Sequence, residues 1–192
     1  MNSRTIALTA ALVLAGCTTN EKNSGLVIDH VVLGQQQTIN NVLTCVFQAA
    51  NSETLYPTFN PGQANTNFGL AGFVVKNQLT DPSTTNSILR TNSTTFSPHQ
   101  AVVDYELVGA NSSVAEQVIP VSSSAVPGNT LTAVAVPLFS PTAVQTALGA
   151  FTGFVRTTVR IEGRLDDGST VSTSAHDYVV SICNNCPTST CF

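Results

Sequence analysis

The chain has 192 residues and a mass of 20.0 kDa, which suits one domain with a hydrophobic core of its own. Only 9% of the residues are charged, against ~25% in typical domains, and the net charge is −4. This balance argues against nucleic-acid binding, which needs a concentrated basic surface, so no nucleic-acid partner is expected.

The first residues have the pattern of an export signal. Arg4 gives a basic start, an apolar run extends from Thr5 to Val13, and small residues precede Cys17. The apolar run is shorter than the ~20 residues that a membrane-spanning helix needs. We therefore interpret residues 1–16 as a signal peptide.

The residues Leu14-Ala15-Gly16-Cys17 resemble the lipobox of bacterial lipoproteins: a leucine, two small residues and a cysteine. The resemblance implies cleavage before Cys17, a diacylglycerol on its sulfur and acylation of the new N-terminus. An ordinary signal peptide, with Cys17 there by chance, is the alternative. Two or more acyl chains anchor a protein stably, so the resemblance implies a lipid bilayer as the partner of acylated Cys17.

The residue after Cys17 bears on the destination. It is Thr18, not the aspartate that often retains lipoproteins at the inner membrane. The resemblance therefore implies the bacterial cell envelope, with the outer membrane favoured. Residues 17–25, polar after the cysteine and without periodicity, are interpreted as the lipidated cysteine and a flexible tether.

The rest of the chain alternates between strand-like runs and turn residues. Taken in chain order, the predicted strands are Leu26–Leu33, Asn41–Ala49, Phe68–Leu79, Ala101–Val108, the weaker Glu116–Val121, Leu131–Phe139, Val155–Leu165 and Thr170–Ile182. One short helix is expected near 141–148, with Ser140 as its cap and Pro141 in its first position. In Val155–Leu165 apolar and charged residues alternate, which indicates a half-buried strand, and Asp166-Asp167-Gly168 predicts the turn after it.

This pattern predicts an all-β fold: a single antiparallel β-sandwich, immunoglobulin-like in architecture, over residues 26–183. The Cys…Trp…Cys pattern of true immunoglobulin domains is absent, since the chain has no Trp. Two long loops, Ser52–Asn67 and Thr80–His99, interrupt the strands and are the expected ligand-contacting segments. Alternatively, their aromatic residues only pin these loops to the sandwich.

Apart from Cys17, four cysteines remain: Cys45, Cys183, Cys186 and Cys191. An even number in an exported protein predicts disulfides; a zinc site and a redox CxxC pair are the weaker alternatives. Three pairings are possible. We favour Cys45 with Cys183, and Cys186 with Cys191, which gives a disulfide-closed tail over residues 184–192, because bridging Cys183 to Cys186 across two residues is sterically harder.

Several side chains could carry chemistry. Strand geometry aligns Arg156, Arg160 and Arg164 on one face, as an anion-binding row or as a solvated face paired with Glu162, Asp104 and Glu106. Asp104 and Glu106 share a face about 7 Å apart, within the range of glycosidase carboxylates, but such pairs are usually plain exterior. His176-Asp177 invites a dyad, yet neighbouring strand residues point to opposite faces. His30, His99 and His176 show no ligand spacing, so no metal and no cofactor is expected.

No convergent acid, base and nucleophile is visible, whereas catalysis needs such groups within hydrogen-bond reach. We therefore expect a membrane-anchored envelope lipoprotein that acts as a non-catalytic binding or scaffolding module, not an enzyme. An envelope protein or a glycan is the expected partner. The alternative is an envelope hydrolase that acts on a glycan or a peptide.

Overall fold

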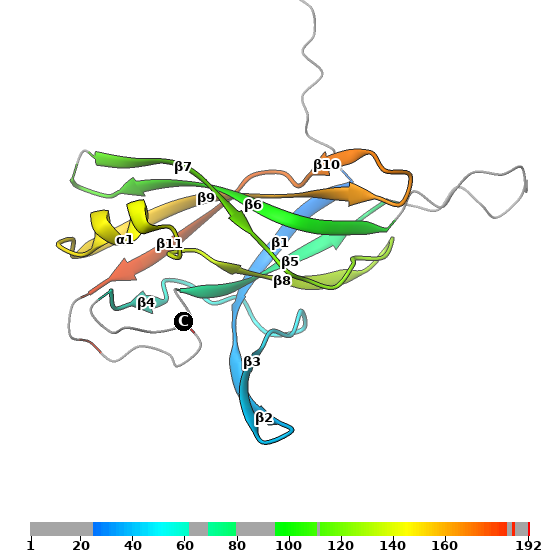
Figure 1. Ribbon diagram of the computed structural model, residues 1–192, viewed down its shortest axis with the longest axis horizontal. Helices are drawn as coiled ribbons and strands as arrows, with labels where there is room; N and C mark the ends of the chain where they lie inside the picture. The colour runs from blue at the N-terminus through cyan, green and yellow to red at the C-terminus, as the bar shows by residue number, and fades with distance from the viewer. Residues whose placement is uncertain (1–24, 62–68, 80–94, 111, 184–185, 187–191) are drawn as a thin grey trace, which may run out of the picture.

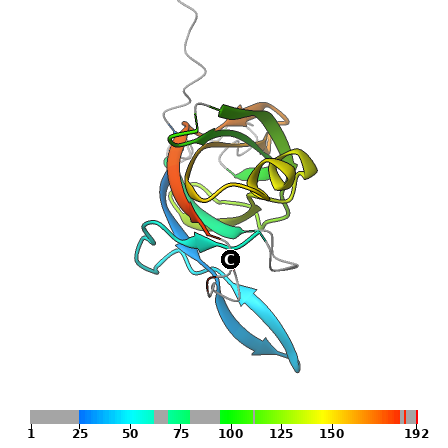
Figure 2. The same ribbon diagram turned by 90° about the vertical axis from the view of Figure 1, so that its left-hand side faces the viewer.

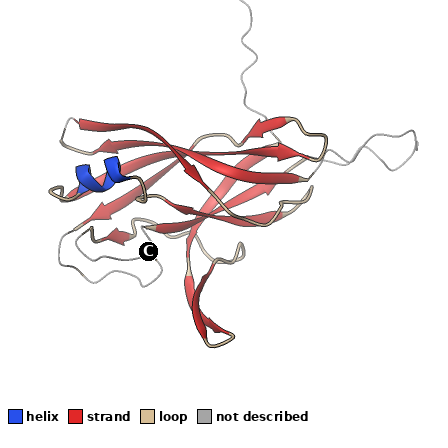
Figure 3. Ribbon diagram, viewed as in Figure 1, coloured by secondary structure: helices blue, strands red, loops and turns tan. Residues whose placement is uncertain are grey.

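The computed structural model describes residues 25–61, 69–79, 95–110, 112–183, 186 and 192. The predicted signal peptide, lipobox and tether, up to residue 24, lie outside them. So do Cys191, most of the loop Thr80–His99 and part of Ser52–Asn67. The described chain is mostly strand with one short helix (Figure 3). Its elements are β1 (Leu26–Leu33), β2 (Gln35–Ile39), β3 (Val42–Val46), β4 (Thr58–Phe59), β5 (Leu70–Asn77), β6 (Phe96–Leu107), β7 (Ser112–Pro120), β8 (Leu131–Pro137), α1 (Thr142–Leu148), β9 (Gly153–Leu165), β10 (Thr170–Ser172) and β11 (His176–Ile182).

Two sheets enclose one core (Figures 1 and 2). The small sheet has the order β1-β5-β8, and the large sheet has the order β4-β11-β9-β6-β7 with β10 added to β9. The predicted all-β sandwich with its short helix is therefore confirmed. One pairing departs from a purely antiparallel arrangement, because β4 runs parallel to β11 and pairs Thr58 with Ser181.

Side-chain alternation decides which face of each strand enters the core. In β9, Val155, Val159 and Ile161 are fully buried, while the arginines between them face outward. In β6, Phe96 and Ala101 both enter the core although they are five positions apart, and an odd offset in a regular strand places two side chains on opposite faces. The register shift between Pro98 and Gln100 accounts for this, because one extra residue turns every following side chain to the other face.

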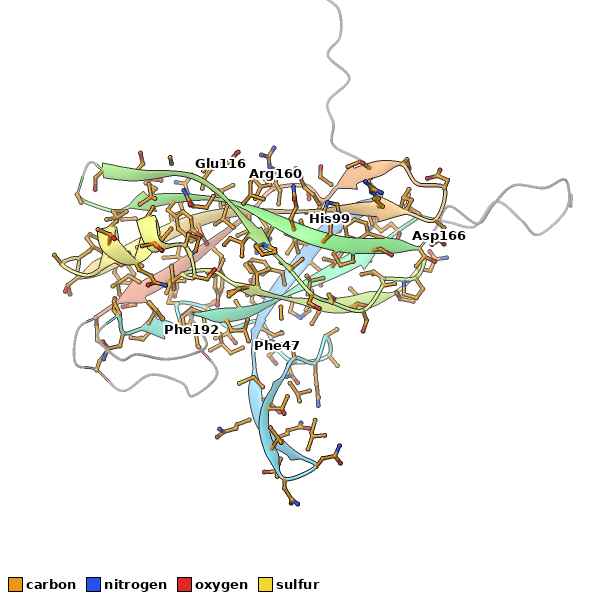
Figure 4. All side chains as sticks on the ribbon, in the orientation of Figure 1. Phe47, His99, Glu116, Arg160, Asp166 and Phe192 are labelled. Atoms are coloured by element: carbon orange, nitrogen blue, oxygen red, sulfur yellow. A yellow bond between two sulfur atoms is a disulfide. The ribbon has the colours of Figure 1, made fainter. Side chains whose placement is uncertain are left out.

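Aromatic rings fill one end of the core. Phe59, Phe139 and Phe192 are buried and pack on one another, with Phe59 and Phe139 centroids 4.5 Å apart (Figure 4, which labels Phe192). The hydroxyl of Tyr105, on β6, donates to the main-chain oxygen of Leu138, just beyond β8. This end of the sandwich is therefore closed by side chains of four separate chain segments.

Helix α1 forms where it was predicted, but its cap differs. The N-cap position is Pro141 with extended backbone (φ −65°, ψ 134°), and no side chain caps the helix. The prediction that Ser140 caps the helix is therefore wrong, because Ser140 lies one residue before the N-cap position. Its main-chain oxygen accepts a hydrogen bond from the Gln145 side chain at 3.0 Å. The helix is held by its buried residues Val144 and Leu148.

The strands β2 and β3 form a hairpin that projects from the sandwich, as both views show (Figures 1 and 2). Its two-residue turn is Asn40-Asn41, with φ of 52° and 62°, as the favoured hairpin turns require. We expected the run Asn41–Ala49 to be a strand of the sandwich, with Cys45 in mid-strand. The run does form a strand that contains Cys45, namely β3, but this strand belongs to a separate two-stranded sheet with β2.

The cysteine pairing also differs from the one we favoured. Cys183 is joined to Cys186, with Cα atoms 6.1 Å apart, which is within the span that a disulfide bridges. Both cysteines lie beside the end of β4: the Cys183 amide donates to Phe59 O at 3.1 Å and the Asn60 side chain donates to Cys186 O at 3.1 Å. Cys45, on β3, is disulfide-bonded as well, but not to Cys183, because Cys183 is already joined to Cys186.

Candidate functional site

The outer face of the large sheet carries an exposed aromatic pair. Tyr56 and Phe154 are 62% and 48% exposed, and their ring centroids lie 6.4 Å apart in an edge-to-face arrangement. Val108, also exposed, is next to them, since its amide donates to Phe154 O at 2.9 Å. We call Tyr56, Val108 and Phe154 the aromatic end. Exposed apolar groups gathered in this way commonly mark an interaction surface.

The parallel pairing of β4 with β11 builds the aromatic end. Ser181, on β11, stands opposite Phe154, on β9, and its amide donates to Pro57 O at 2.8 Å. This hydrogen bond brings Tyr56, which precedes the buried Pro57, to the edge of Phe154. The predicted binding loop Ser52–Asn67 therefore contributes Tyr56 to the surface and Phe59 to the core.

Tyr56 adopts an unusual backbone conformation. Its φ is 53°, although it is not a glycine and the residue before a proline normally stays extended. Such a conformation costs on the order of 1–3 kcal/mol and persists only where the surroundings impose it. An exposed aromatic side chain held by a strained backbone is a candidate for direct contact with a ligand.

A cluster of charges continues the surface along β9. The Arg156 guanidinium lies 3.3 Å from the Glu106 carboxylate and 3.5 Å from that of Asp177. The Thr158 hydroxyl donates to Asp177 at 2.7 Å. We call Glu106, Arg156 and Asp177 the ion-pair cluster. All three side chains are half exposed, so their attraction contributes only ~0–1 kcal/mol to stability, and their hydrogen-bonding groups remain accessible.

A shallow depression of about 330 Å³ adjoins this cluster, over the register shift between β6 and β7. Asp104, Glu106, Arg156 and Thr158 line it from β6 and β9, and Glu116 from β7. Glu116 in turn lies 3.3 Å from Arg160. Figure 4 labels both side chains. The depression is thus lined by donors and acceptors of both charges.

The predicted arginine row follows this surface. Arg156 pairs with Glu106, one of the expected acids, and also with Asp177; Arg160 pairs with Glu116. Asp177 and Glu116 were not expected as partners, because the order of strands around β9 was unknown. Arg164 is exposed and makes no ion pair within the described part of the chain. Glu162, the other expected partner, accepts instead from Gln100 at 2.7 Å.

The carboxylates Asp104 and Glu106 do share the outer face of β6, and both are exposed. Glu106 is committed to Arg156, while Asp104 stands at the register shift beside the depression. The structure therefore places the two acids together but on an open surface.

His176 and Asp177 belong to different surroundings. Asp177 faces outward and contacts Thr158 and Arg156. His176 is half-buried, and this burial lowers its pKa. The negative charges of Glu53 and Asp177 oppose that shift. His30 lies on the same side and contacts Asp29 at 2.8 Å and the main-chain oxygen of Asn51 at 3.1 Å. No hydrogen bond joins His176 to Asp177 among residues the structure describes. Within that part of the chain, no group of three His, Cys, Asp or Glu residues is arranged to hold a metal ion.

The sequence reasoning missed Phe154. Phe154 follows Gly153 and precedes the run Val155–Leu165 from which the strand was predicted. The one signal for it in the sequence is its spacing of two residues from Arg156, which places both side chains on the outer face of the strand.

No protein-family model matches the chain, and comparisons with curated proteins and with solved structures find no significant match. No helix in the described ranges is long and apolar enough to cross a membrane.

Proposed function

We propose that this protein is a non-catalytic binding module of the bacterial envelope, anchored through acylated Cys17, that binds a glycan. The aromatic end, the ion-pair cluster and the depression beside it form the binding surface. The lipobox resemblance supports the anchor, and Thr18 after Cys17 supports the outer membrane as the destination. The observation that carries the proposal is the exposed Tyr56–Phe154 pair, with Tyr56 held at positive φ.

The chemistry of the surface supports a glycan. A sugar ring offers C–H groups on its faces, which pack on aromatic rings, and hydroxyl groups at its rim, which both donate and accept hydrogen bonds. Phe154 and Arg156 are two residues apart on one strand, so their side chains emerge on the same face ~7 Å apart. A ring on the aromatic end would therefore place its hydroxyls beside Arg156, Glu106 and Asp177.

The openness of the surface supports binding without turnover. The ion-pair cluster is half exposed, and the depression is shallow and shared with solvent. Electrostatic catalysis depends on a site from which water is largely excluded, where fixed charges act strongly. A surface where Arg156 and Arg160 already have carboxylate partners suits reversible hydrogen bonding to neutral hydroxyls.

Co-sedimentation of the purified protein with isolated envelope polysaccharide tests the proposal. We expect Tyr56→Ala and Phe154→Ala each to raise Kd by roughly 2–10-fold, since an aromatic contact contributes ~0.5–1.5 kcal/mol. Leu131→Ala is the matched control, because Leu131 is 46% exposed but lies on the other sheet. Equal binding by all three variants, or binding to envelope proteins alone, contradicts the proposal. If the protein instead breaks down the polysaccharide and Asp104→Asn abolishes that activity, the protein is a hydrolase.

A further inference from the structure

The projecting hairpin β2–β3 is an unusual element for a soluble sandwich. Within the described chain it forms a two-stranded sheet of its own, and such isolated hairpins are only marginally stable in water. At its tip Ile39 and Val42 are 46% and 62% exposed. The hairpin therefore has backbone hydrogen-bonding groups and apolar side chains left for a further partner.

The sandwich itself protects its edge strands. The edge strand β7 carries Glu116 and ends at Pro120, and β1 carries Asp29 and a register shift. Strand β4 has only two residues, and β8 ends at Pro137. Charges, prolines, irregularities and short length are the features that prevent edge strands from pairing with other chains.

The hairpin has none of these features. Residues 35–46 contain no charged residue and no proline, and the pairing from Gln35–Val46 to Ile39–Val42 is regular throughout. Cys45, on β3, is disulfide-bonded, whereas β2 carries no cysteine and only uncharged side chains along its outer edge. This edge thus lacks the features that protect the edge strands of the sandwich.

The two-residue turn fixes which groups point outward. In such a hairpin the pair next to the turn, Ile39 and Val42, exchanges hydrogen bonds, and the pairs alternate from there. Gln36 and Thr38 consequently direct their N–H and C=O groups away from β3. These two residues flank Gln37 symmetrically.

We propose that the outer edge of β2 pairs antiparallel with β2 of a second copy of this chain, about a two-fold axis at Gln37. Gln36 of each copy then stands opposite Thr38 of the other, and both exchange N–H···O=C hydrogen bonds. The two small hairpins become one four-stranded sheet, which offsets the marginal stability of each.

A second copy fits this edge better than an unrelated peptide. Antiparallel pairing about a two-fold axis is self-complementary, so each outward N–H of one copy meets a C=O of the other in the correct orientation. The hairpin is uncharged, so it adds no repulsion between copies that each carry a net charge of −4. Because the hairpin projects from the sandwich in both views, two hairpins can meet without contact between the bodies (Figures 1 and 2).

Site-specific photocrosslinking in producing cells tests the pairing on the full chain. With p-benzoylphenylalanine in place of Gln37, we expect a product with the mass of two chains that contains peptides of this chain alone. The same probe in place of Gln117, on the protected edge strand β7, should give no such product. Adding Thr38→Pro, which removes an outward N–H, should abolish the product.

The second edge variant guards against misfolding. The double substitution Gln36→Lys with Thr38→Lys leaves the backbone intact and places like charges opposite each other across the axis, so it should also abolish the product. Circular dichroism should show that either variant retains the sandwich. No two-copy product from the Gln37 position, a product with another protein there, or an undiminished product in a folded lysine variant would overturn the proposal.

Discussion

Tyr105 and Tyr178 are two phenols buried in the same core with different hydrogen bonding. The Tyr105 hydroxyl donates to Leu138 O, whereas the Tyr178 hydroxyl has no hydrogen-bond partner within the described residues and its ring packs edge-to-face on Phe73. Burial raises the pKa of both phenols, and the charge of Glu53 adds to the rise for Tyr178. A buried hydroxyl that lacks a partner costs free energy, while one that has a partner contributes to stability.

The two hydroxyls should therefore respond oppositely to removal. We expect Tyr105→Phe to lower the free energy of unfolding by ~1–2 kcal/mol, because it leaves the Leu138 oxygen without its donor. Tyr178→Phe should leave the free energy of unfolding unchanged or raise it by up to about 1 kcal/mol. Urea unfolding at pH 7 measures both, and a larger loss in Tyr178→Phe would refute this.

The same phenols make the stability of the fold depend on pH in the alkaline range. Their folded-state pKa values are raised above the unfolded value of about 10. Their contribution to the free energy of unfolding is therefore intact below pH ~10 and is lost as the pH rises toward the folded-state pKa. Each Phe variant should accordingly lose less stability between pH 9 and pH 11 than the wild type, by the same urea measurement.

Among the elements, the hairpin is joined to the sandwich by a close contact at its base. Phe47, just after β3, packs over Gly72 of β5, where an added Cβ would lie 2.5 Å from the ring (Figure 4 labels Phe47). Gly72 stands opposite Val32 of β1 on the outer side of the small sheet. Because Gly72 has no side chain, the Phe47 ring can pack directly against the sheet at this position.

Gly72→Ala should loosen this contact. The methyl group displaces the Phe47 ring, and such overpacking costs ~1–3 kcal/mol. We expect faster amide hydrogen exchange in residues 35–46, with little change in β6 and β9, as measured by mass spectrometry. Gly163→Ala is the converse control, because its Cβ would collide with Ser97 O and the Phe96 ring inside the sandwich. Unchanged exchange in the Gly72→Ala hairpin would show that Phe47 does not hold it.

Sequence patterns identified the elements that alternate strongly or have distinct turn residues. Strand β1 was predicted with its bounds, β9 nearly so, and the turn at Gly168 is confirmed by its φ of 83°. Strand β2 was missed because its glutamines show no apolar alternation, and β4 because two residues make no pattern. The arginine row and Glu106 were predicted from strand geometry. The Tyr56–Phe154 pair was not, because it depends on a parallel pairing between segments more than a hundred residues apart.

On the scale of the whole molecule, the ion pairs of the arginines are gathered in one region. All arginine ion pairs of the described residues lie on the outer face of the large sheet, at Arg156 and Arg160. With only 9% charged residues in the chain, most of the remaining surface is neutral. The fold thus depends mainly on the core between the sheets, and the charged face is free to serve recognition.

The membrane anchor is testable at this scale. Because the lipobox resemblance implies that acyl chains on Cys17 hold the protein, Cys17→Ser should move it from the detergent phase to the aqueous phase in a phase-partition experiment. The circular dichroism spectrum of the soluble form should match that of the wild type, since the described fold begins only at Gly25. Unchanged partitioning of Cys17→Ser would contradict the anchor.

The continuity of β1 with the hairpin has a mechanical consequence. Only Gly34 separates β1 from β2, so a pull between Gly25 and the hairpin tip runs along the axis of β1. Such tension shears β1 against β5, its neighbour in the small sheet. It loads the hydrogen bonds that β1 makes with β5, from Leu26 to Leu33, all together instead of opening them one at a time. The large sheet, with its exposed face, lies outside this line of force. A molecule held at one end and coupled through its hairpin would therefore bear tension while the proposed binding surface keeps its shape.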